Sequence, residues 1–361
     1  MFVLEQALGH RTHAANLSRL VPELAGAAGV RPQFVHIAYD PGPLARITRW
    51  SNWTIRAGVR ARRAVARLRR AGPVDALYVH TQVPALLLGR HLRRVPTVVS
   101  FDATPKQYDE FGEQYRHRRA PAPVERAKHA LHMRCFHAAR RIVTWSQWAA
   151  DDLIARYGTD PAKIDVISPG VDLDLWQPAV RERADGRPLE ILFVGGDLDR
   201  KGGAELLAAY ARLRERQLPA VELHLVTQSP VRPAPGVIVH TDLAANSPEL
   251  RARFAAADVF CLPTFADTFG LVLLEAAASG LPLVTTPVGA IPEIVAPGVT
   301  GELVAPGDVD ALADALARLL GDADVRRTYG ANARRLAETQ HDARANAARI
   351  LDAIAAARSG A

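Results

Sequence analysis

Short apolar runs alternate with longer amphipathic stretches along the whole chain. Twelve runs have the pattern of buried strands: 2–5, 34–39, 76–80, 97–101, 142–145, 164–167, 190–194, 222–226, 237–240, 258–262, 283–286 and 302–304. Helical periodicity fills the intervals, as at 203–216, where Leu206, Tyr210 and Leu213 share one face. This alternation predicts an α/β protein with parallel sheets covered on both faces by helices.

The alternation occurs twice, which predicts two Rossmann-like domains with parallel sheets that face a central cleft. Turn-forming residues at 168–178 follow the sixth run and mark the expected boundary. We therefore predict an N-terminal domain over 1–172 and a second domain over 173–340. An alanine-rich helical stretch within 341–361 is assigned to the first domain as a tail helix. A chain of 361 residues that is 48% hydrophobic is large enough for two cores.

Cysteine usage and hydropathy indicate the class of protein. Cys135 and Cys261 have no metal-ligand spacing and lie in apolar surroundings, which predicts buried thiols in a reducing compartment. The first residues run directly into a strand pattern, and no apolar run approaches the length of a membrane span. We expect a cytoplasmic protein, peripheral at most to the inner face of the cell membrane.

Positive charge is concentrated in one segment of a chain whose net charge is +7. Residues 41–74 contain no acidic residue and carry nine arginines, from Arg46 to Arg70, together with Trp50 and Trp53. A helix over 55–68 with a basic face suits an anionic membrane surface, but it also suits an ordinary solvated face. No nucleic-acid-binding motif accompanies the charge, so no nucleic-acid partner is expected.

Two carboxylates flank a predicted loop-to-helix junction. The run at 258–262 is followed by a loop that contains Asp267, and Gly270 opens a helix. Glu275, about 7.5 Å along that helix, is the only charged residue in 268–292. The helix start suits a phosphate, with Glu275 placed to reach a ribose and Asp267 to face what lies beyond the phosphates. The alternative is a loop or capping aspartate and a satisfied buried glutamate.

A glycine-rich turn follows the first strand of the second half. Gly195 and Gly196 allow a close backbone approach, and Arg200 and Lys201 supply charge for a pyrophosphate. The turn is neither a Walker A loop nor a GxGxxG motif, and solvated cations on an ordinary turn are the alternative interpretation. Two cations, a helix start and two carboxylates together suit a nucleoside diphosphate that carries a sugar.

These motifs resemble the retaining GT-B glycosyltransferases of family 4. The likeness covers almost the whole second half, at 193–202, 267–275, 285–295 and 298–304. In the first half it is narrower, at 8–17, 100–105, 143–148 and 168–172. The resemblance implies the GT-B fold, with a C-terminal helix that crosses back to the first domain. It also implies sugar transfer from a nucleotide-diphosphate sugar to an acceptor hydroxyl, in bacterial polysaccharide, glycolipid or related glycoconjugate biosynthesis.

The resemblance also implies roles for individual residues. Glu275 binds the donor ribose, Asp267 holds the donor sugar hydroxyls, and Arg200 and Lys201 hold the pyrophosphate. The remaining donor contacts come from backbone groups of Thr268, Phe269, Gly270, Leu271, Gly195 and Gly196, and from the turn formed by Gly9 and His10. The nucleotide sugar is a substrate, so neither a cofactor nor a metal is expected. Asp172 and Asp174 have the Asp-x-Asp spacing that metal-dependent transferases use, but they lie at the expected domain boundary.

Three positions depart from the family pattern. Asp267 stands where the family usually has glutamate, which shortens the side chain by one methylene. Gly196 replaces a common arginine, and Arg200 is expected to compensate. Asp102 replaces a common histidine. One interpretation is a carboxylate on the acceptor or donor-sugar side of the site, and the other is a turn-forming residue. His80, at a strand end, either lines the cleft on the acceptor side or caps a turn.

Other activities fit the same residues. A phosphorylase or an epimerase shares the GT-B fold, and the Asp267 departure fits a non-catalytic nucleotide-sugar-binding scaffold. The basic segment fits a membrane-surface binder with an unknown acceptor, lipid-linked or anionic. The remaining histidines of the basic helical region, His117, His129, His132 and His137, are expected at the surface.

Overall fold

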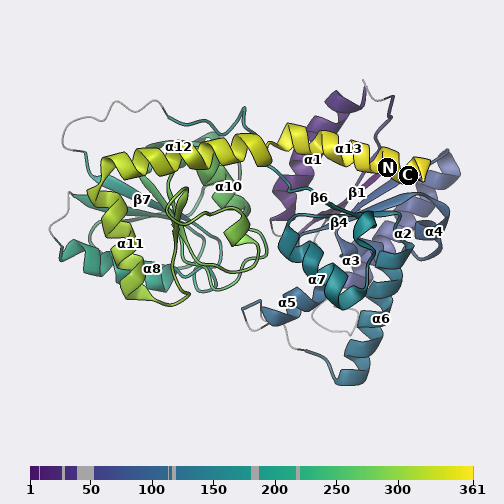
Figure 1. The fold of residues 1–361 in the computed structure, drawn as a ribbon, viewed down its shortest axis with the longest axis horizontal. Coiled ribbons are helices and arrows are strands. Elements are labelled where there is room, and N and C mark those ends of the chain that lie inside the picture. The colour runs from purple at the N-terminus through teal and green to yellow at the C-terminus, as the bar shows by residue number, and fades with distance from the viewer. Residues whose placement is uncertain are drawn as a thin grey trace. The chain divides into compact units, whose positions relative to one another are not determined.

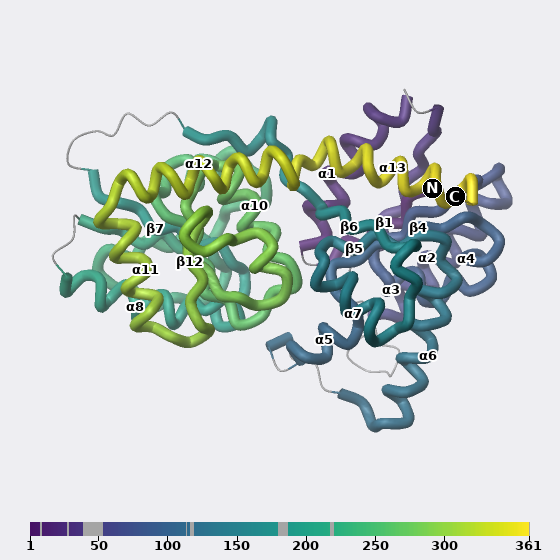
Figure 2. The backbone as a smooth tube through the Cα atoms, in the orientation of Figure 1, coloured from purple at the N-terminus to yellow at the C-terminus, as the bar shows by residue number. Residues whose placement is uncertain are grey.

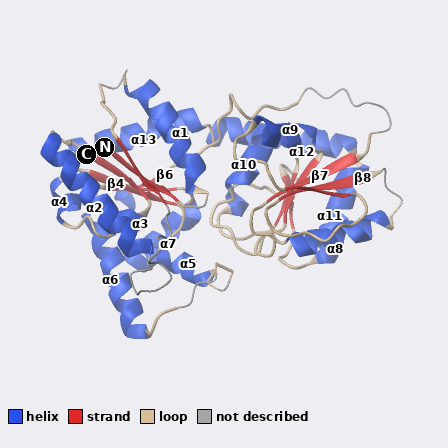
Figure 3. Cartoon of the chain, turned by 180° about the vertical axis from the view of Figure 1, so that it is seen from behind, coloured by secondary structure: helices blue, strands red, loops and turns tan. Residues whose placement is uncertain are grey.

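The computed structural model describes residues 1–7, 9–26, 29–38, 53–112, 114–115, 119–179, 187–216 and 220–360. The chain folds into two compact units. Unit 1 comprises Met1–Gly112, Arg118–Pro169 and Ala343–Ala361, and unit 2 comprises Glu113–His117 and Gly170–Asp342. In each unit, a twisted sheet is covered on both faces by helices (Figure 3).

Unit 1 contains a six-stranded parallel sheet with the order β2-β1-β3-β4-β5-β6. Its strands are β1 (Phe2–Gln6), β2 (Phe34–Ala38), β3 (Leu77–His80), β4 (Thr97–Phe101), β5 (Arg141–Thr144) and β6 (Ile164–Val166). Its helices are α1 (His10–Ala25), α2 (Trp53–Ala71), α3 (Gln82–Ala85), α4 (Arg90–Arg94), α5 (Pro105–Glu110), α6 (Ala122–Ala138), α7 (Gln147–Tyr157) and α13 (Ala343–Ser359), with a 3-10 turn at Pro161–Lys163. These elements are labelled in Figure 1.

Alternating strand residues build a core on each face of this sheet. On one face, Phe2, Leu4 and Tyr78 pack against α1 and α13. On the other face, Val3 and Val79 belong to a core with α2, α6 and α7. The two helices α1 and α13 lie side by side although they come from opposite ends of the chain (Figure 2). The predicted tail helix therefore packs onto the first unit, as expected.

Unit 2 contains a second six-stranded parallel sheet, with the order β12-β11-β10-β7-β8-β9. Its strands are β7 (Leu189–Val194), β8 (Val221–Val226), β9 (Val237–His240), β10 (Val259–Leu262), β11 (Leu283–Thr285) and β12 (Gly301–Leu303). Its helices are α8 (Gly203–Arg214), α9 (Pro248–Ala256), α10 (Leu271–Ala278), α11 (Val309–Gly321) and α12 (Ala323–Gln340), with a 3-10 turn at Ile291–Glu293. All twelve predicted strands form, and each described end lies within one residue of its predicted position.

Some expectations require correction. The tail helix begins at Ala343 instead of 341, because α12 continues to Gln340. His132, expected at the surface, is buried: its Nδ1 lies 2.9 Å from the Lys128 carbonyl oxygen, and its ring lies beside that of Phe136, one turn along α6. Arg126 and Arg134 of the same helix are exposed, whereas Lys128, one turn before His132, is half-buried. Within the same helix, His129 is partly covered by Tyr157, whereas His137 is exposed; His117 lies outside the described residues.

Other features match the expectations. Cys135 and Cys261 are free and buried, and burial raises the pKa of the Cys135 thiol to about 12. In the described part of the basic segment, α2 buries Ala57, Ala61 and Val65 and exposes arginines on its other side. The part of that segment before residue 53 lies outside the described residues. No helix in the described ranges combines the length and apolar character needed to cross a membrane.

Candidate functional site

Three loops meet at the carboxyl edge of the unit 2 sheet. They follow β7, β10 and β11, which are neighbours in the sheet, so parallel pairing places their ends together. The Phe265 amide donates to the Arg200 carbonyl (2.9 Å), and the Thr286 hydroxyl donates to the Thr264 carbonyl (2.5 Å). The glycine-rich turn and the loop before α10 are therefore parts of one hydrogen-bonded assembly.

Lys201 and Asp267 form the central ion pair of this assembly. The Lys201 ammonium donates to Asp267 Oδ2, and both side chains are about one-eighth exposed. Burial lowers the pKa of Lys201, although the negative charge of Asp267 acts to raise it. Burial by itself would raise the pKa of Asp267, but the charges of Lys201 and Arg200 hold that pKa below its ordinary value. A cation and a carboxylate are thus held together in a mostly buried pair.

Arg200 makes different contacts from Lys201. Its Nη1 donates to the Ala266 carbonyl oxygen (2.8 Å), and its Nε lies 3.6 Å from Asp197 Oδ2. The Asp197 carboxylate also accepts from the Arg200 amide (3.2 Å). Asp197 therefore orients the arginine from within the same turn. The sequence pattern did not identify this role, although an aspartate three residues before an amide is the spacing of a local side-chain cap.

Glu275 lies one turn inside α10, a helix that begins after Gly270 without a side-chain cap. The absence of a cap leaves backbone N–H groups at the helix start for an external acceptor. Among the described residues, the Glu275 side chain has neither a hydrogen-bond donor nor a cation as a partner. Burial raises the pKa of this carboxyl to about 8. A half-buried carboxyl group without a protein partner next to a helix start is typical of a ligand site rather than of a structural core.

Two glycines set how closely the loops approach. Gly202 has a φ of +72°, and a Cβ there would lie 2.0 Å from the Pro263 carbonyl oxygen. Gly289 has a φ of +57°, and its Cβ would lie 2.1 Å from the carbonyl oxygen of Asp267. No other residue type fits either position without moving the backbone that carries Asp267 or the Lys201 turn. Gly289 was not among the predicted site residues.

The predicted donor glycines differ in their surroundings. A Cβ on Gly195 would lie 3.0–3.2 Å from Phe193 and Lys201, whereas nothing lies within 4 Å of one on Gly196. The space beside Gly196 is therefore open, which fits its place in a ligand-facing turn. Phe269 is buried, so that only its backbone is available to a ligand, and its ring packs beside His341. Thr268 is also buried, and its carbonyl accepts from the Ala290 amide at 3.2 Å.

A second group of polar side chains lies at the carboxyl edge of the unit 1 sheet. It contains His10 at the start of α1, His80 at the end of β3 and Asp102 after β4. His80 Nε2 lies 3.1 Å from His10 Nδ1, and His10 Nε2 lies 3.9 Å from Asp102 Oδ2. Gly9 is the N-cap of α1 and, with a φ of −62°, has an ordinary helical backbone. The four predicted residues of this unit are thus brought together.

The helix caps next to this group bear on the turn-capping interpretation of His80 and Asp102. Thr81, rather than His80, caps α3, because its hydroxyl accepts from the Val83 amide. Likewise the capping box of α5 uses Thr104 and not Asp102. Asp102 is buried, and its Oδ2 accepts from the Tyr108 hydroxyl at 2.9 Å. Neither His80 nor Asp102 is therefore a simple turn former.

Two members of the group were missed by the sequence pattern, His13 and Trp145. The Trp145 ring stacks on His80 with a centroid distance of 5.2 Å and an interplanar angle of 9°. It also contacts the edges of His10 and His13. Burial lowers the pKa of His13 to about 3 and that of His80 well below its ordinary value, and neighbouring histidines add to both shifts. Both rings are therefore neutral at physiological pH and keep a hydrogen-bond acceptor.

Two family models match the chain. The model described as "Glycosyl transferases group 1" matches residues 188–322. The model described as "Glycosyltransferase Family 4" matches residues 6–175. The first match contains the whole assembly around Lys201, Asp267 and Glu275, and the second contains the histidine group of unit 1.

Curated relatives match in part. An MMP alpha-(1->4)-mannosyltransferase of Mycolicibacterium hassiacum is 39% identical over 210 residues, which is 54% of this chain and 49% of that protein. A D-inositol 3-phosphate glycosyltransferase of Kribbella flavida is 35% identical over 217 residues, 54% of this chain and 51% of the relative. The chain thus spans about half the length of the curated relatives it matches.

Solved structures match over almost the full length. Sucrose-phosphate synthase from Thermosynechococcus elongatus gives a TM-score of 0.74 at 21% identity and covers 97% of both chains. Anabaena HepE in complex with UDP and glucose gives a TM-score of 0.69 at 17% identity, and the match covers 98% of this chain and 99% of HepE. The lipopolysaccharide glycosyltransferase WaaG gives 0.67 at 18% identity and covers 98% of both. The fold, with its two parallel sheets, is GT-B, as the sequence predicted.

Proposed function

Because the chain belongs to the family 4, group 1 glycosyltransferases, we propose that it moves a sugar from a nucleotide-diphosphate sugar to an acceptor hydroxyl. The observation that carries this proposal is the unpartnered Glu275 carboxyl beside an uncapped helix start. It lies in the same hydrogen-bonded assembly of loops as the cations Arg200 and Lys201. A ribose diphosphate presents hydroxyl donors and phosphate oxygens, the two groups that this assembly leaves to be satisfied.

We assign the donor contacts within unit 2 as follows. Glu275 accepts hydrogen bonds from the ribose hydroxyls, and the backbone N–H groups of Gly270 and Leu271 face the phosphates. Lys201 lies between the phosphates and Asp267, and this pairing holds its ammonium in place before the donor arrives. Asp267 accepts from a hydroxyl of the donor sugar and so fixes the sugar against the diphosphate.

The proposed reaction keeps the anomeric configuration. The bond between the anomeric carbon and the diphosphate oxygen breaks, and its electron pair stays on that oxygen as positive charge develops on the sugar ring. Arg200, Lys201 and the α10 helix start stabilise the departing diphosphate. The acceptor oxygen then bonds to the same face of the sugar and gives its proton to the departing phosphate oxygen. No step requires a metal or a cofactor.

We assign the acceptor or sugar side to the unit 1 group. Neutral His80 is buried and positions the His10 ring through its Nε2, and the Asp102 carboxylate is fixed by Tyr108. Such groups recognise hydroxyls. Some relatives are named for glycosyl transfer to an inositol phosphate, which supports a polyol or sugar hydroxyl as the acceptor. A role in polysaccharide, glycolipid or related glycoconjugate synthesis follows from such an acceptor.

The test is thermal unfolding of the protein in the presence of UDP-, GDP- and ADP-sugars. A donor at 100 times its Kd adds about 2.7 kcal/mol to the free energy of unfolding, which raises the midpoint by several degrees. We expect one nucleotide series to stabilise the protein, followed by product formation with sugar and polyol acceptors. No stabilisation by any of the three series would contradict the proposal. Stabilisation without turnover across the acceptors would favour the non-catalytic scaffold.

We further propose that the exposed face of α2 contacts an anionic membrane surface. The large exposed side chains of this helix are Ile55, Arg62, Arg63, Arg67, Arg69 and Arg70. The buried face rests on the unit 1 core, where Gly58 packs directly against Leu87. The two free, buried thiols support a reducing, cytoplasmic compartment for this contact.

Sedimentation with lipid vesicles tests the membrane contact. We expect the protein to sediment with phosphatidylglycerol vesicles and not with phosphatidylcholine vesicles. The variant Arg63→Gln/Arg67→Gln should bind about thirtyfold more weakly, because each basic residue near such a surface contributes about 1 kcal/mol. Arg335→Gln/Arg358→Gln, which removes two exposed charges elsewhere, is the control. Equal binding by the two double variants would refute a role for α2.

A further inference from the structure

A hollow of about 480 Å³ opens at the amino edge of the unit 1 sheet, away from the histidine group at the carboxyl edge. It is formed where three chain segments enter the neighbouring strands β4, β5 and β6. The residue immediately before each strand lines the hollow: Pro96 before β4, Arg140 before β5 and Lys163 before β6. Because neighbouring parallel strands lie about 4.8 Å apart, these residues line one continuous opening.

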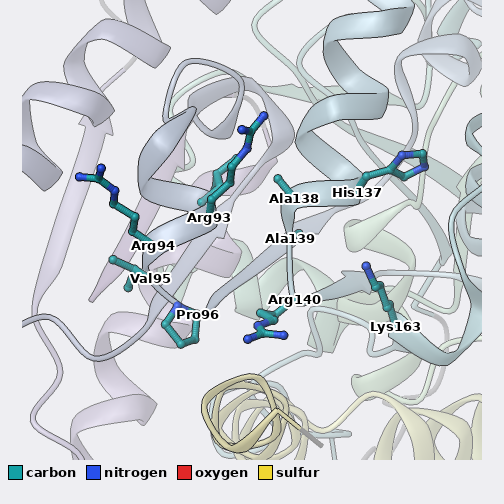
Figure 4. Close-up of a pocket in the computed structure, with 10 residues that line it drawn as sticks. Arg93, Arg94, Val95, Pro96, His137, Ala138, Ala139, Arg140 and Lys163 are labelled. Atoms are coloured by element: carbon teal, nitrogen blue, oxygen red, sulfur yellow. The ribbon is translucent and has the colours of Figure 1, made fainter.

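The lining of the hollow carries positive charge and no carboxylate. Its residues are Leu92, Arg93, Arg94, Val95, Pro96, His137, Ala138, Ala139, Arg140 and Lys163. Figure 4 shows Arg93 and Arg94 leaving the end of α4 in different directions, with Arg140 and Lys163 across the hollow from them. Leu92, Val95 and Ala139 are buried and form an apolar floor. The hollow therefore combines a cationic rim with an apolar base.

The nearby acids are already engaged. Asp165 holds Arg141, the first residue of β5, through two hydrogen bonds of 2.8 Å. Asp160 accepts from the Ala162 amide and so caps the 3-10 turn that ends at Lys163. Within the described ranges, no carboxylate forms an ion pair with Arg93, Arg94, Arg140 or Lys163. Several cations that repel one another without a counter-charge favour an external anion.

We propose that this hollow binds a phosphate-bearing organic molecule. Arg140 and Lys163 hold the phosphate oxygens, since guanidinium and ammonium groups form charge-assisted hydrogen bonds with phosphate. The carbon-bearing part of the ligand rests on the apolar floor. The volume lies within the range of small-molecule sites. Phospholipid headgroups and free phosphate esters share this chemistry, and both are of a size to enter. The site is independent of the donor site of unit 2.

Equilibrium dialysis with radiolabelled inorganic pyrophosphate tests the soluble source. We expect two classes of site on the wild-type protein, one in this hollow and one at the proposed donor site. Arg140→Gln/Lys163→Gln should weaken one class at least tenfold, and Lys201→Ala should weaken the other. Arg335→Gln/Arg358→Gln, with the same loss of charge elsewhere, should change neither class. Circular dichroism of each variant checks that it is folded.

Sedimentation with phosphatidylglycerol vesicles tests the lipid source, with the α2 arginines left intact. Loss of vesicle binding by Arg140→Gln/Lys163→Gln, relative to Arg335→Gln/Arg358→Gln, identifies a lipid headgroup as the ligand. Loss of pyrophosphate binding without that effect identifies a soluble phosphate ester. The proposal is overturned when the folded Arg140→Gln/Lys163→Gln variant keeps wild-type binding in both measurements. Failure of the donor assignment would instead appear as wild-type pyrophosphate binding by Lys201→Ala.

Discussion

Glu275→Gln is expected to stabilise the ligand-free protein at alkaline pH while weakening donor binding at least tenfold. The pKa of this carboxyl is about 8 in the folded protein, against an ordinary value of 4.5. Between these values, the folded state retains a proton that the unfolded state releases, so stability falls as the pH rises from about 4.5 to 8. Glutamine does not titrate and removes this loss. The loss of binding follows from replacing charge-assisted hydrogen bonds, each worth about 1.5–3 kcal/mol.

The gain in stability depends on pH in a defined way. The gain in stability should be absent below about pH 4.5, increase between about pH 4.5 and 8, and reach its maximum above pH 8. Each pKa unit corresponds to about 1.36 kcal/mol, and with a discount for the partial exposure of Glu275 we expect about 2–4 kcal/mol. Urea unfolding at pH 5 and pH 8.5 measures this gain, and calorimetric titration with the donor measures the affinity.

The matched control is Glu215→Gln, at an exposed glutamate that ends α8 in the same unit. It should change neither the pH dependence of unfolding nor the affinity for the donor. An equal pH dependence in the two variants would show that burial does not perturb Glu275. Unchanged donor affinity in Glu275→Gln would remove the ribose assignment.

Lys201→Ala is expected to reduce sugar transfer at least a hundredfold and to destabilise unit 2 by about 2–4 kcal/mol. The truncation leaves the Asp267 carboxylate mostly buried without its cation, and breaking one side of such a pair is strongly destabilising. The same ammonium is assigned to the departing diphosphate, and such electrostatic groups typically contribute two to three orders of magnitude in rate. Urea unfolding and a transfer assay at saturating acceptor measure the two effects.

A second substitution separates the two roles of Lys201. Lys201→Ala/Asp267→Asn removes both charges, so most of the lost stability should return while transfer stays low. Arg216→Ala, which breaks an exposed ion pair with Asp314 at 2.7 Å, is the stability control and should cost at most about 1 kcal/mol. A double variant as unstable as Lys201→Ala would contradict a buried pair. Wild-type transfer by folded Lys201→Ala would remove the lysine from the mechanism.

The local pattern of apolar and polar residues predicted the strands, the turn and the helix start that position the site residues of unit 2. Strands that are buried on both faces are continuous apolar runs, so β7, β10 and β11 were visible without any knowledge of the fold. The glycine-rich turn and the junction at Gly270 were visible because they break these runs. Glu275 was conspicuous as a lone charge among apolar residues, and the structure leaves its carboxyl without a partner among the described residues.

Pairings across the sheets were not predictable in the same way. Arg200 and Lys201 look equivalent in the sequence, yet one binds the Ala266 carbonyl and the other binds Asp267. His13 and Trp145 lie in segments that resemble the family, at 8–17 and 143–148, but nothing in the pattern singles out either residue as part of a site. Their contact with His80 depends on which strands become neighbours, and this order is decided by packing across the sheet rather than by local sequence.

The sequence by itself determined the alternation of strands and helices, the two parallel sheets and the loops at which chemistry occurs, because these depend on short-range periodicity. Only the tertiary structure decided which side chains meet. The strand order β1-β3-β4-β5 unites His10, His80, Asp102 and Trp145, and the order β4-β5-β6 opens the cationic hollow at the other edge. Residues tens of positions apart become neighbours because burying two faces of a sheet fixes the strand order, and that burial is a property of the whole unit.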